Sequence, residues 1–249
     1  MTSSYLITGA SGGIGLAMCR HLLSQDHQVH AVSRSASGHA DLQRLAQTHQ
    51  GQLALHDCDV SNEQRVQALA REIRERSADL DGLINCAGLL HDREAAIWPE
   101  KRIRDINANS LMRLFAINSV APMLLAANFL PLLNQPHRTH FATLSARVGS
   151  ITDNRLGGWY GYRASKAAQN QFVRTLAIEA RRSAPNLVVL ALHPGTTDTA
   201  LSVPFQGNVP DDKLFSPDFV AERLLKIVQG SSPEDSGRFV AWDGSDIPW

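Results

Sequence analysis

Apolar and amphipathic segments alternate along the whole chain. The apolar segments have the length of strands, and most end in polar or turn residues; they span 5–8, 29–33, 52–56, 83–86, 140–144, 187–192 and 238–242. Helical patterns between them cover 15–23, 41–48, 63–77, 101–114, 119–133, 162–182 and 217–229. Strands that alternate with helices predict right-handed crossovers and a parallel sheet of about seven strands, with helices on both faces.

Nothing in the sequence divides these segments into separate domains. No long charged, proline-rich or glycine-serine tract interrupts the chain, and no internal repeat is visible. We therefore expect residues 1–249 to form one α/β domain with a doubly wound sheet, large enough to bury a stable core.

The charge balance argues against nucleic-acid and membrane partners. Lysine and arginine total 24, as do aspartate and glutamate, so no long-range field points toward a polyanion. The longest apolar region, 110–133, is interrupted by Arg113, Asn118, Pro122 and Pro131, which would be costly in lipid. We expect this region to form a buried helix. The N-terminus, MTSSYLITG, also lacks the pattern of a secretory signal.

The cysteines and histidines add little chemistry. Cys19, Cys58 and Cys86 are an odd number without CxxC spacing, which favours reduced thiols and a cytoplasmic protein. The ten histidines show no HExxH or other metal-ligand spacing, so we expect no metal site.

A glycine-rich turn follows the first predicted strand. Gly9, Gly13 and Gly15 leave room for the backbone to approach a pyrophosphate, and the helix that begins there offers amide donors and a positive dipole end. The spacing is GxxxGxG rather than GxGxxG. The turn therefore predicts a dinucleotide site, although it could equally be a tight connection.

The end of the second predicted strand bears on the choice of dinucleotide. An acid at this place bonds a free ribose 2'-hydroxyl, whereas a basic residue accommodates a 2'-phosphate. The segment here carries Ser33 and Arg34 and no acid. This favours NADP(H) over NAD(H), because a guanidinium is suited to phosphate. The alternative is that Arg34 is one of many surface arginines.

Tyr162 and Lys166 form the candidate chemical pair. They are four residues apart and so share one face of a predicted helix. An isolated phenol has a pKa of about 10. A nearby ammonium lowers this pKa and makes the phenol a better proton donor to a developing alkoxide. The alternative is an exposed helical pair that contributes only a few tenths of a kcal/mol.

Five motifs in this order resemble the short-chain dehydrogenase/reductase family in its single-domain branch. They are TGASGGIG at 8–15, CDV at 58–60, NCAG at 85–88, YRASK at 162–166 and HPGTTDT at 193–199. The resemblance covers nearly the whole chain and implies a Rossmann fold that binds a nicotinamide dinucleotide. The cofactor-binding residues that it implies are Gly9, Ser11, Gly13, Ile14, Gly15, Ser33, Arg34, Asp59, Val60, Asn85, Ala87, Gly88, Tyr162, Lys166, Pro194, Gly195, Thr197 and Thr199.

The resemblance also implies two further catalytic positions. Asn118 matches the family's asparagine, which holds a water that joins the lysine to a proton relay; its alternative role is to kink the helix. The family's catalytic serine is the second in S-S-x-x-G. Here Ala146 stands in that position, and the candidate Ser145 would point to the opposite face of its strand. A local bulge could turn Ser145 inward, or Ser150 or a hydroxyl from elsewhere could take its place.

Three segments near the predicted active site resemble one subgroup of the family. This subgroup contains C-factor-like proteins and sniffer-type carbonyl reductases. The segments that carry the resemblance are ITDNRLGGWYGY, RVGSI and the terminal DGSDIPW. Trp159 and Tyr160 could line an apolar substrate pocket or pack against a neighbour. The region 204–215 occupies the place of the family's substrate lid, and its short length predicts an open site.

These features together predict an NADPH-dependent enzyme that reduces a small carbonyl substrate, an aldehyde, ketone or quinone. The alternative is a non-enzymatic dinucleotide-binding signalling protein, which Ala146 favours and the retained pair of Tyr162 and Lys166 opposes. Apolar surface on the helices around 119–133 and 164–182 predicts a homodimer or homotetramer.

Overall fold

The sheet is the centre of the molecule. The computed structural model describes residues 2–76 and 79–249. Its seven main strands are β1 (Ser4–Thr8), β2 (Gln28–Ser33), β3 (Leu53–Asp57), β4 (Gly82–Asn85), β5 (Thr139–Leu144), β6 (Leu187–His193) and β9 (Arg238–Ala241). All pair in parallel, in the order β3-β2-β1-β4-β5-β6-β9. The predicted doubly wound sheet is therefore confirmed.

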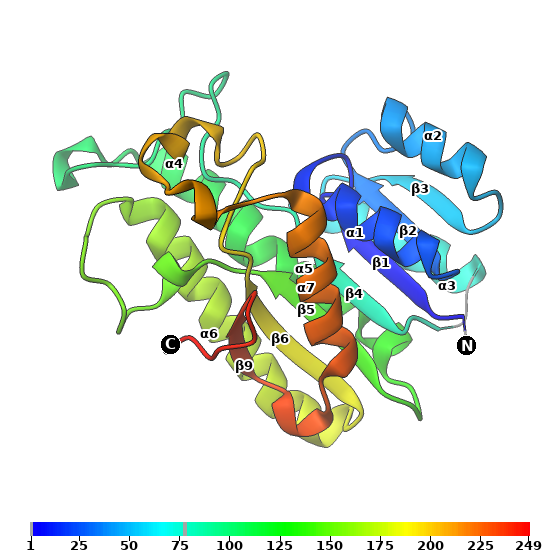
Figure 1. The fold of residues 1–249 in the computed structure, drawn as a ribbon. Helices are drawn as coiled ribbons and strands as arrows, with labels where there is room; N and C mark the ends of the chain where they lie inside the picture. The colour runs from blue at the N-terminus through cyan, green and yellow to red at the C-terminus, as the bar shows by residue number, and fades with distance from the viewer. Residues whose placement is uncertain (1, 77–78) are drawn as a thin grey trace.

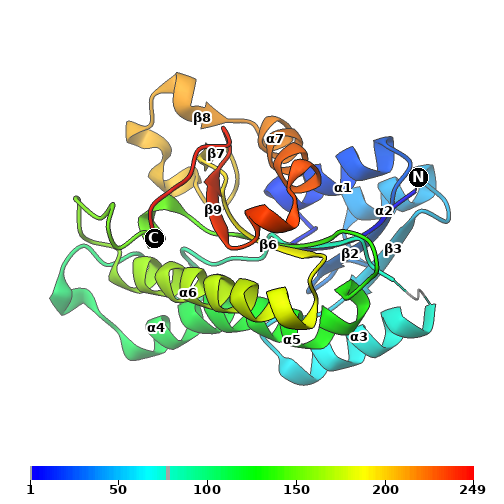
Figure 2. The same cartoon turned by 90° about the horizontal axis from the view of Figure 1, so that it is seen from below.

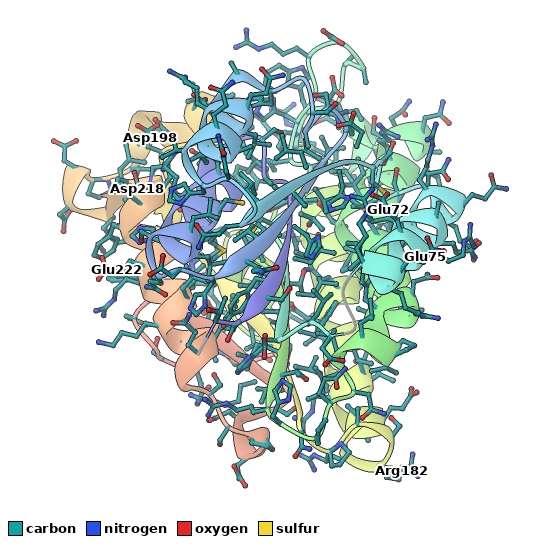
Figure 3. The ribbon with its side chains drawn as sticks, turned by 90° about the vertical axis from the view of Figure 1, so that its right-hand side faces the viewer. Glu72, Glu75, Arg182, Asp198, Asp218 and Glu222 are labelled. Atoms are coloured by element: carbon teal, nitrogen blue, oxygen red, sulfur yellow. The ribbon has the colours of Figure 1, made fainter. Side chains whose placement is uncertain are left out.

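Helices cover both faces of this sheet (Figure 1). One layer holds α1 (Gly13–Ser24), α2 (Ala40–Thr48) and α7 (Pro217–Gly230), and the other holds α3 (Glu63–Arg76), α4 (Ala108–Phe115), α5 (Ala121–Leu133) and α6 (Tyr160–Ser183), as Figure 2 shows. Charged side chains mark the outer surfaces, with Glu72 and Glu75 on α3 and Asp218 and Glu222 on α7 (Figure 3). This is the Rossmann arrangement that the sequence predicts.

The strands are mainly apolar because both of their faces are buried. On β1, Leu6 packs into one helix layer and Ile7 into the other, and Phe141 and Ala142 divide in the same way on β5. The sheet therefore has two hydrophobic cores, one under each layer of helices.

One predicted helix starts later than expected. The pattern 101–114 predicted a single helix, but only a short 3₁₀ turn, Ile103–Asp105, precedes α4. Asn107 ends the extended segment before α4, and its side chain accepts a hydrogen bond from the amide of Ser110, as an N-cap does. The last residue of the predicted helix 63–77 lies outside the described residues.

The helical stretch from α4 to α5 has the length and apolar composition of a membrane span. It is nevertheless a core helix here, because Leu125, Phe129, Leu132 and Leu133 are buried with the sheet and with α3 and α6. Its middle, Ala116–Val120, is a π-helical turn. The expected buried helix is confirmed.

Candidate active site

The glycine turn lies where β1 meets α1, beside the end of β4. Gly9 has a φ of +64°, and a Cβ there would lie 2.9 Å from the backbone nitrogen of Ala87. A Cβ on Gly15 would collide with the carbonyl of Gly9. Both glycines are therefore required by close backbone packing, and the turn presents main chain instead of side chains to its open side.

Hydrogen bonds join this turn to the neighbouring strands. The Thr8 hydroxyl donates to Asn85 Oδ1 at 2.5 Å and accepts from the Ala87 amide at 3.4 Å. Asn85 Nδ2 then donates to the hydroxyl of Thr143 at 3.0 Å. The NCAG segment thus holds the ends of β1, β4 and β5 together at the carboxyl edge of the sheet.

The end of β2 carries no acid. Arg34 is exposed and forms no ion pair with any residue that the structure describes. The carboxylate of Asp57, at the end of β3, accepts hydrogen bonds from the amide and hydroxyl of Ser37, and these bonds lower the pKa of Asp57. The acid on the adjacent strand is therefore already bonded within the protein, and Arg34 is the charged side chain that follows β2.

The start of α6 is set by an unusual turn. Gly157, Gly158 and Trp159 all have left-handed φ values, of +64°, +65° and +53°. Glu100 anchors the turn, since its carbonyl accepts from the Trp159 amide at 2.6 Å and its carboxylate from the Gly161 amide at 3.0 Å. A Cβ on Gly161 would lie 2.8 Å from that carboxylate. This explains the GGWYG sequence that precedes the candidate tyrosine.

Tyr162 and Lys166 face inward from the first turns of α6, and both are buried. The Lys166 ammonium donates to the Leu144 carbonyl at 2.7 Å and to Gln169 Oε1 at 2.9 Å, and it lies 5.9 Å from the centre of the Tyr162 ring. Burial lowers the pKa of Lys166 to about 7 and raises the pKa of Tyr162. The predicted lowering of the phenol pKa is therefore wrong for this arrangement, in which burial is the cause that sets the direction of the shift.

Asn118 lies on the π-helical turn next to α6. Its Oδ1 accepts from the Leu89 amide at 2.7 Å, and its Nδ2 donates to the Leu89 carbonyl at 2.8 Å and to the Ser165 hydroxyl at 3.0 Å. A Cβ on Gly88 would lie 3.6 Å from Asn118 Oδ1 and 3.8 Å from Lys166 Nζ. The asparagine and the lysine therefore both lie beside Gly88.

Ser145 does not join this group. Its hydroxyl donates to Asn170 Oδ1 of α6 at 2.6 Å inside the core. Ala146 packs instead with the apolar cluster that contains Tyr162. Ser145 and Ala146 thus point to opposite sides, as the strand register predicts, and the methyl group of Ala146 lies on the side of Tyr162.

The loop after β6 reaches across to the glycine turn. A Cβ on Gly13 would lie 2.9 Å from Cγ2 of Thr199, so the turn and the HPGTTDT segment are in contact. Gly195, with a φ of +72°, packs against Phe215 and Trp242. Thr196–Thr197 (β7) pairs with Leu214–Phe215 (β8) and fixes the base of the following segment.

The lid region predicted at 204–215 begins in a 3₁₀ turn, Val203–Asn208, that packs toward Tyr162 through Trp159. Phe205 packs edge-on against Trp159 at 5.0 Å, and Trp159 against Tyr162 at 6.1 Å between ring centres. His91 stacks on Trp98 at 5.4 Å and hydrogen-bonds the Ala200 carbonyl through Nε2 at 3.2 Å. The expectation of an open site is wrong, because aromatic contacts close even this short lid and leave Tyr162 only 8 % exposed.

A glycine turn, a buried tyrosine–lysine pair and the carboxyl edge of a parallel sheet occur together in one known family. Residues 4–208 match the model of the family described as short chain dehydrogenase. The chain belongs to this family. This family consists of oxidoreductases that bind nicotinamide dinucleotides, and the resemblance stated from the motifs is confirmed.

Relatives of this short-chain dehydrogenase cover most of its length. It is 30% identical over 99% of the chain to the whole of 1-hydroxy-2-glutathionyl-2-methyl-3-butene dehydrogenase of Rhodococcus sp. (strain AD45). It is 34% identical over 68% of the chain to C-signal of Myxococcus xanthus, of which the match covers 93%. The structure of NADPH-bound carbonyl reductase from chicken fatty liver is 29% identical and covers 100% of this chain and 99% of its own, with a TM-score of 0.88. The predicted subgroup resemblance is confirmed.

Sequence reasoning missed several residues of this dehydrogenase's site. His91 and Trp98, both in the loop after β4, close the lid together with Phe205, but no local pattern joins these two segments. Gln169 contacts the lysine, and its spacing of three residues after Lys166 could have revealed it. The C-terminal Trp249, whose role the sequence left open, stacks on Phe239, and its carbonyl accepts from the Thr152 amide at 3.2 Å.

Proposed function

We propose that this dehydrogenase reduces a small apolar carbonyl compound with NADPH and that Tyr162 supplies the proton. The observation that carries the proposal is the meeting of Asn118, Lys166 and Gly88 beside Tyr162, at the strand ends next to the glycine turn. A buried phenol, an ammonium and a carboxamide in this position suit proton transfer to an oxygen.

The residues present fit a bound dinucleotide. At Gly12 a Cβ would meet nothing within 4 Å, so the outer side of the turn is open toward the start of α1, where amides point outward. Arg34, exposed at the end of β2, suits the 2'-phosphate of NADPH. The carbonyl reductase from chicken fatty liver is described as NADPH bound, which supports this choice.

Each side chain has a distinct part in the reaction. When bound, NADPH supplies the hydride that reduces the carbonyl carbon. The Tyr162 hydroxyl donates its proton to the carbonyl oxygen. Once the proton has left, protonated Lys166 stabilises the phenolate that remains, whose charge burial disfavours. Two of the three ammonium hydrogens are bonded within the protein, which leaves one to hold a ribose hydroxyl. Asn118 positions the relay water.

The surroundings of Tyr162 favour an apolar substrate. Its buried cluster consists of Leu90, Ile97 and Leu114, with Ala146, Trp159 and Phe205 packed against it. Aromatic walls of this kind suit flat, apolar carbonyl compounds. Ala146 offers no hydroxyl to the carbonyl oxygen, so the reaction depends more heavily on Tyr162.

The test combines a substrate screen with one variant. Aldehydes, ketones and quinones are supplied to the purified protein, and NADPH oxidation is followed by absorbance. We expect turnover with aromatic ketones or quinones, and a loss of about 100-fold or more in Tyr162→Phe, with NADPH affinity unchanged in a fluorescence titration. Full turnover by Tyr162→Phe would remove the mechanism.

A second function has one observation in its favour. Ala146 beside Tyr162, with the Ser145 hydroxyl bonded to Asn170, is compatible with a dinucleotide-binding signalling protein, and C-signal is among the relatives. Tight NADPH binding without turnover on any carbonyl compound of the screen would support it.

A further inference from the structure

A buried chain of hydrogen bonds connects Lys166 with the centre of the sheet. Gln169, one helical turn after Lys166, accepts from its ammonium at 2.9 Å. Gln169 Nε2 in turn donates to the Thr143 hydroxyl at 2.5 Å and to the Leu144 carbonyl at 3.2 Å. Thr143 also accepts from Asn85, which bonds Thr8 at the start of the glycine turn. The chain thus runs from the cofactor turn to the lysine.

Only one orientation of the Gln169 amide fits these partners. An ammonium donates and never accepts, so the amide oxygen must face Lys166. The amide nitrogen then faces the Thr143 hydroxyl and the Leu144 carbonyl, both of which accept. No atom of Gln169 is exposed to solvent, so water cannot replace these bonds.

We propose that Gln169 is a positioning residue that holds the Lys166 ammonium in its protonated form and in its place beside Gly88 and Tyr162. The inference rests on the proposed function, in which Lys166 acts in hydride transfer.

Few groups besides Gln169 stabilise the protonated form of Lys166. Burial alone accounts for the low pKa of Lys166, and no charged side chain of the described residues acts on it. The titratable side chain that packs beside the Lys166 ammonium is Tyr162. The neighbouring elements, which are α4, the π-helical turn and the 3₁₀ turn at Arg147–Gly149, bring no carboxylate close to the ammonium. The protonated lysine is therefore supported by two carbonyl oxygens, those of Leu144 and Gln169. Of these, only the one on Gln169 can be changed by substitution.

Two substitutions should move the lysine titration in opposite directions. Gln169→Met keeps the volume and removes the acceptor, so the Lys166 titration should fall by about one pH unit or more, as expected for the loss of a hydrogen bond to a charge. Gln169→Glu places a carboxylate beside the ammonium, so the titration should rise. If Gln169 only packed the core, the two substitutions would not shift the Lys166 titration in opposite directions.

Nuclear magnetic resonance with ¹³Cε-labelled lysine measures this without a substrate. The chain has only four lysines. Lys101, Lys213 and Lys226 are exposed and Lys166 is buried, so Lys166 should give the one signal that titrates far from the others. Its assignment follows from its loss in Lys166→Met. Thr139→Val, which removes a buried hydroxyl bonded to the Leu133 carbonyl at the far end of β5, is the matched control for lost stability.

The outcome separates this inference from the proposed function. We expect opposed shifts in the two Gln169 variants and none in Thr139→Val, with the alkaline limb of the pH–rate profile moving in the same directions. An unchanged Lys166 titration in both Gln169 variants overturns the positioning role, whatever the activity. A wild-type protein that reduces no carbonyl compound removes the proposed function, while the titration still tests the effect of Gln169 on Lys166.

Discussion

Gly13 of the glycine turn and Thr199 of the loop after β6 are in direct contact, although they are 186 positions apart in the sequence. A Cβ on Gly13 would lie 2.9 Å from the Thr199 Cγ2, and the Gly13 φ of +49° already disfavours a side chain. The contact closes the two segments around the place proposed for the pyrophosphate. Their fit therefore depends on the missing side chain at Gly13.

Gly13→Ala should lower stability and NADPH affinity together. The strained φ and the collision with Thr199 should cost about 1–3 kcal/mol in the free energy of unfolding, measured with urea. Gly12→Ala is the control for stability, because its extended backbone accepts any residue and its Cβ meets no atom. In Gly13→Ala with Thr199→Ser, part of the loss should be recovered. No coupling between the two substitutions would contradict the contact.

The choice of cofactor should depend on Arg34. Arg34→Ala removes the exposed guanidinium at the end of β2, so NADPH affinity should fall about tenfold or more, while NADH affinity changes little. Both dissociation constants can be measured by fluorescence titration. Arg44→Ala, which removes another exposed arginine that pairs with Asp41 on α2, should change neither constant. Equal losses for both cofactors in Arg34→Ala would count against the assignment.

The parts of this protein that could be predicted from sequence are those whose signals are local. Strand-length apolar runs, the glycines and the spacing of Tyr162 and Lys166 each lie within a few residues, and the sheet follows from their alternation. The pKa of Tyr162 was predicted in the wrong direction because its burial depends on Leu90, Ile97 and Leu114, which come from other segments. The closed lid could not be predicted for the same reason, because its aromatic contacts join segments that lie far apart in the sequence.

The lid should contribute selectively to large substrates. Phe205→Ala removes the ring that packs on Trp159, so KM for a bulky aromatic carbonyl compound should rise about three- to tenfold, the effect expected for one aromatic contact. KM for a small aldehyde should change less. Val203→Ala alters an exposed position in the same lid and should change neither value. Equal changes for large and small substrates would mean that Phe205 acts on the fold and not on the substrate.

Self-association should involve the exposed apolar side chains on the helix layer that holds α5 and α6. Val120, Phe172 and Ile178 are 45%, 40% and 49% exposed there. We expect a dimer or tetramer by light scattering, and smaller species in Phe172→Glu with Ile178→Glu, because charges at a buried interface are costly. Leu156→Glu, at a 92% exposed loop position, is the control. A wild-type monomer would contradict this assembly.

Stability should fall in mild acid because of a buried histidine pair. His30 Nδ1 and His56 Nε2 are 3.0 Å apart between β2 and β3, and Glu72 of α3 lies 3.4 Å from His56 Nδ1. Burial lowers the pKa of His30 to about 4 and also lowers the pKa of His56. The unfolded chain therefore binds protons first as the pH falls below about 6.5, so the stability that is complete above this value is lost toward pH 4.

In the pH range where a histidine is protonated only in the unfolded state, it adds about 1.4 kcal/mol per pH unit to the slope of the unfolding free energy against pH. This applies to both His30 and His56. Replacing both partners with apolar residues, in His30→Leu with His56→Leu, should flatten the dependence of the unfolding free energy on pH between about 5 and 6.5, with a small effect at neutral pH because no unpaired polar group remains. Urea unfolding at several pH values measures the slope. A variant with the wild-type slope would show that the pair takes up protons in the folded state, with Glu72 as the counter-ion that makes this possible.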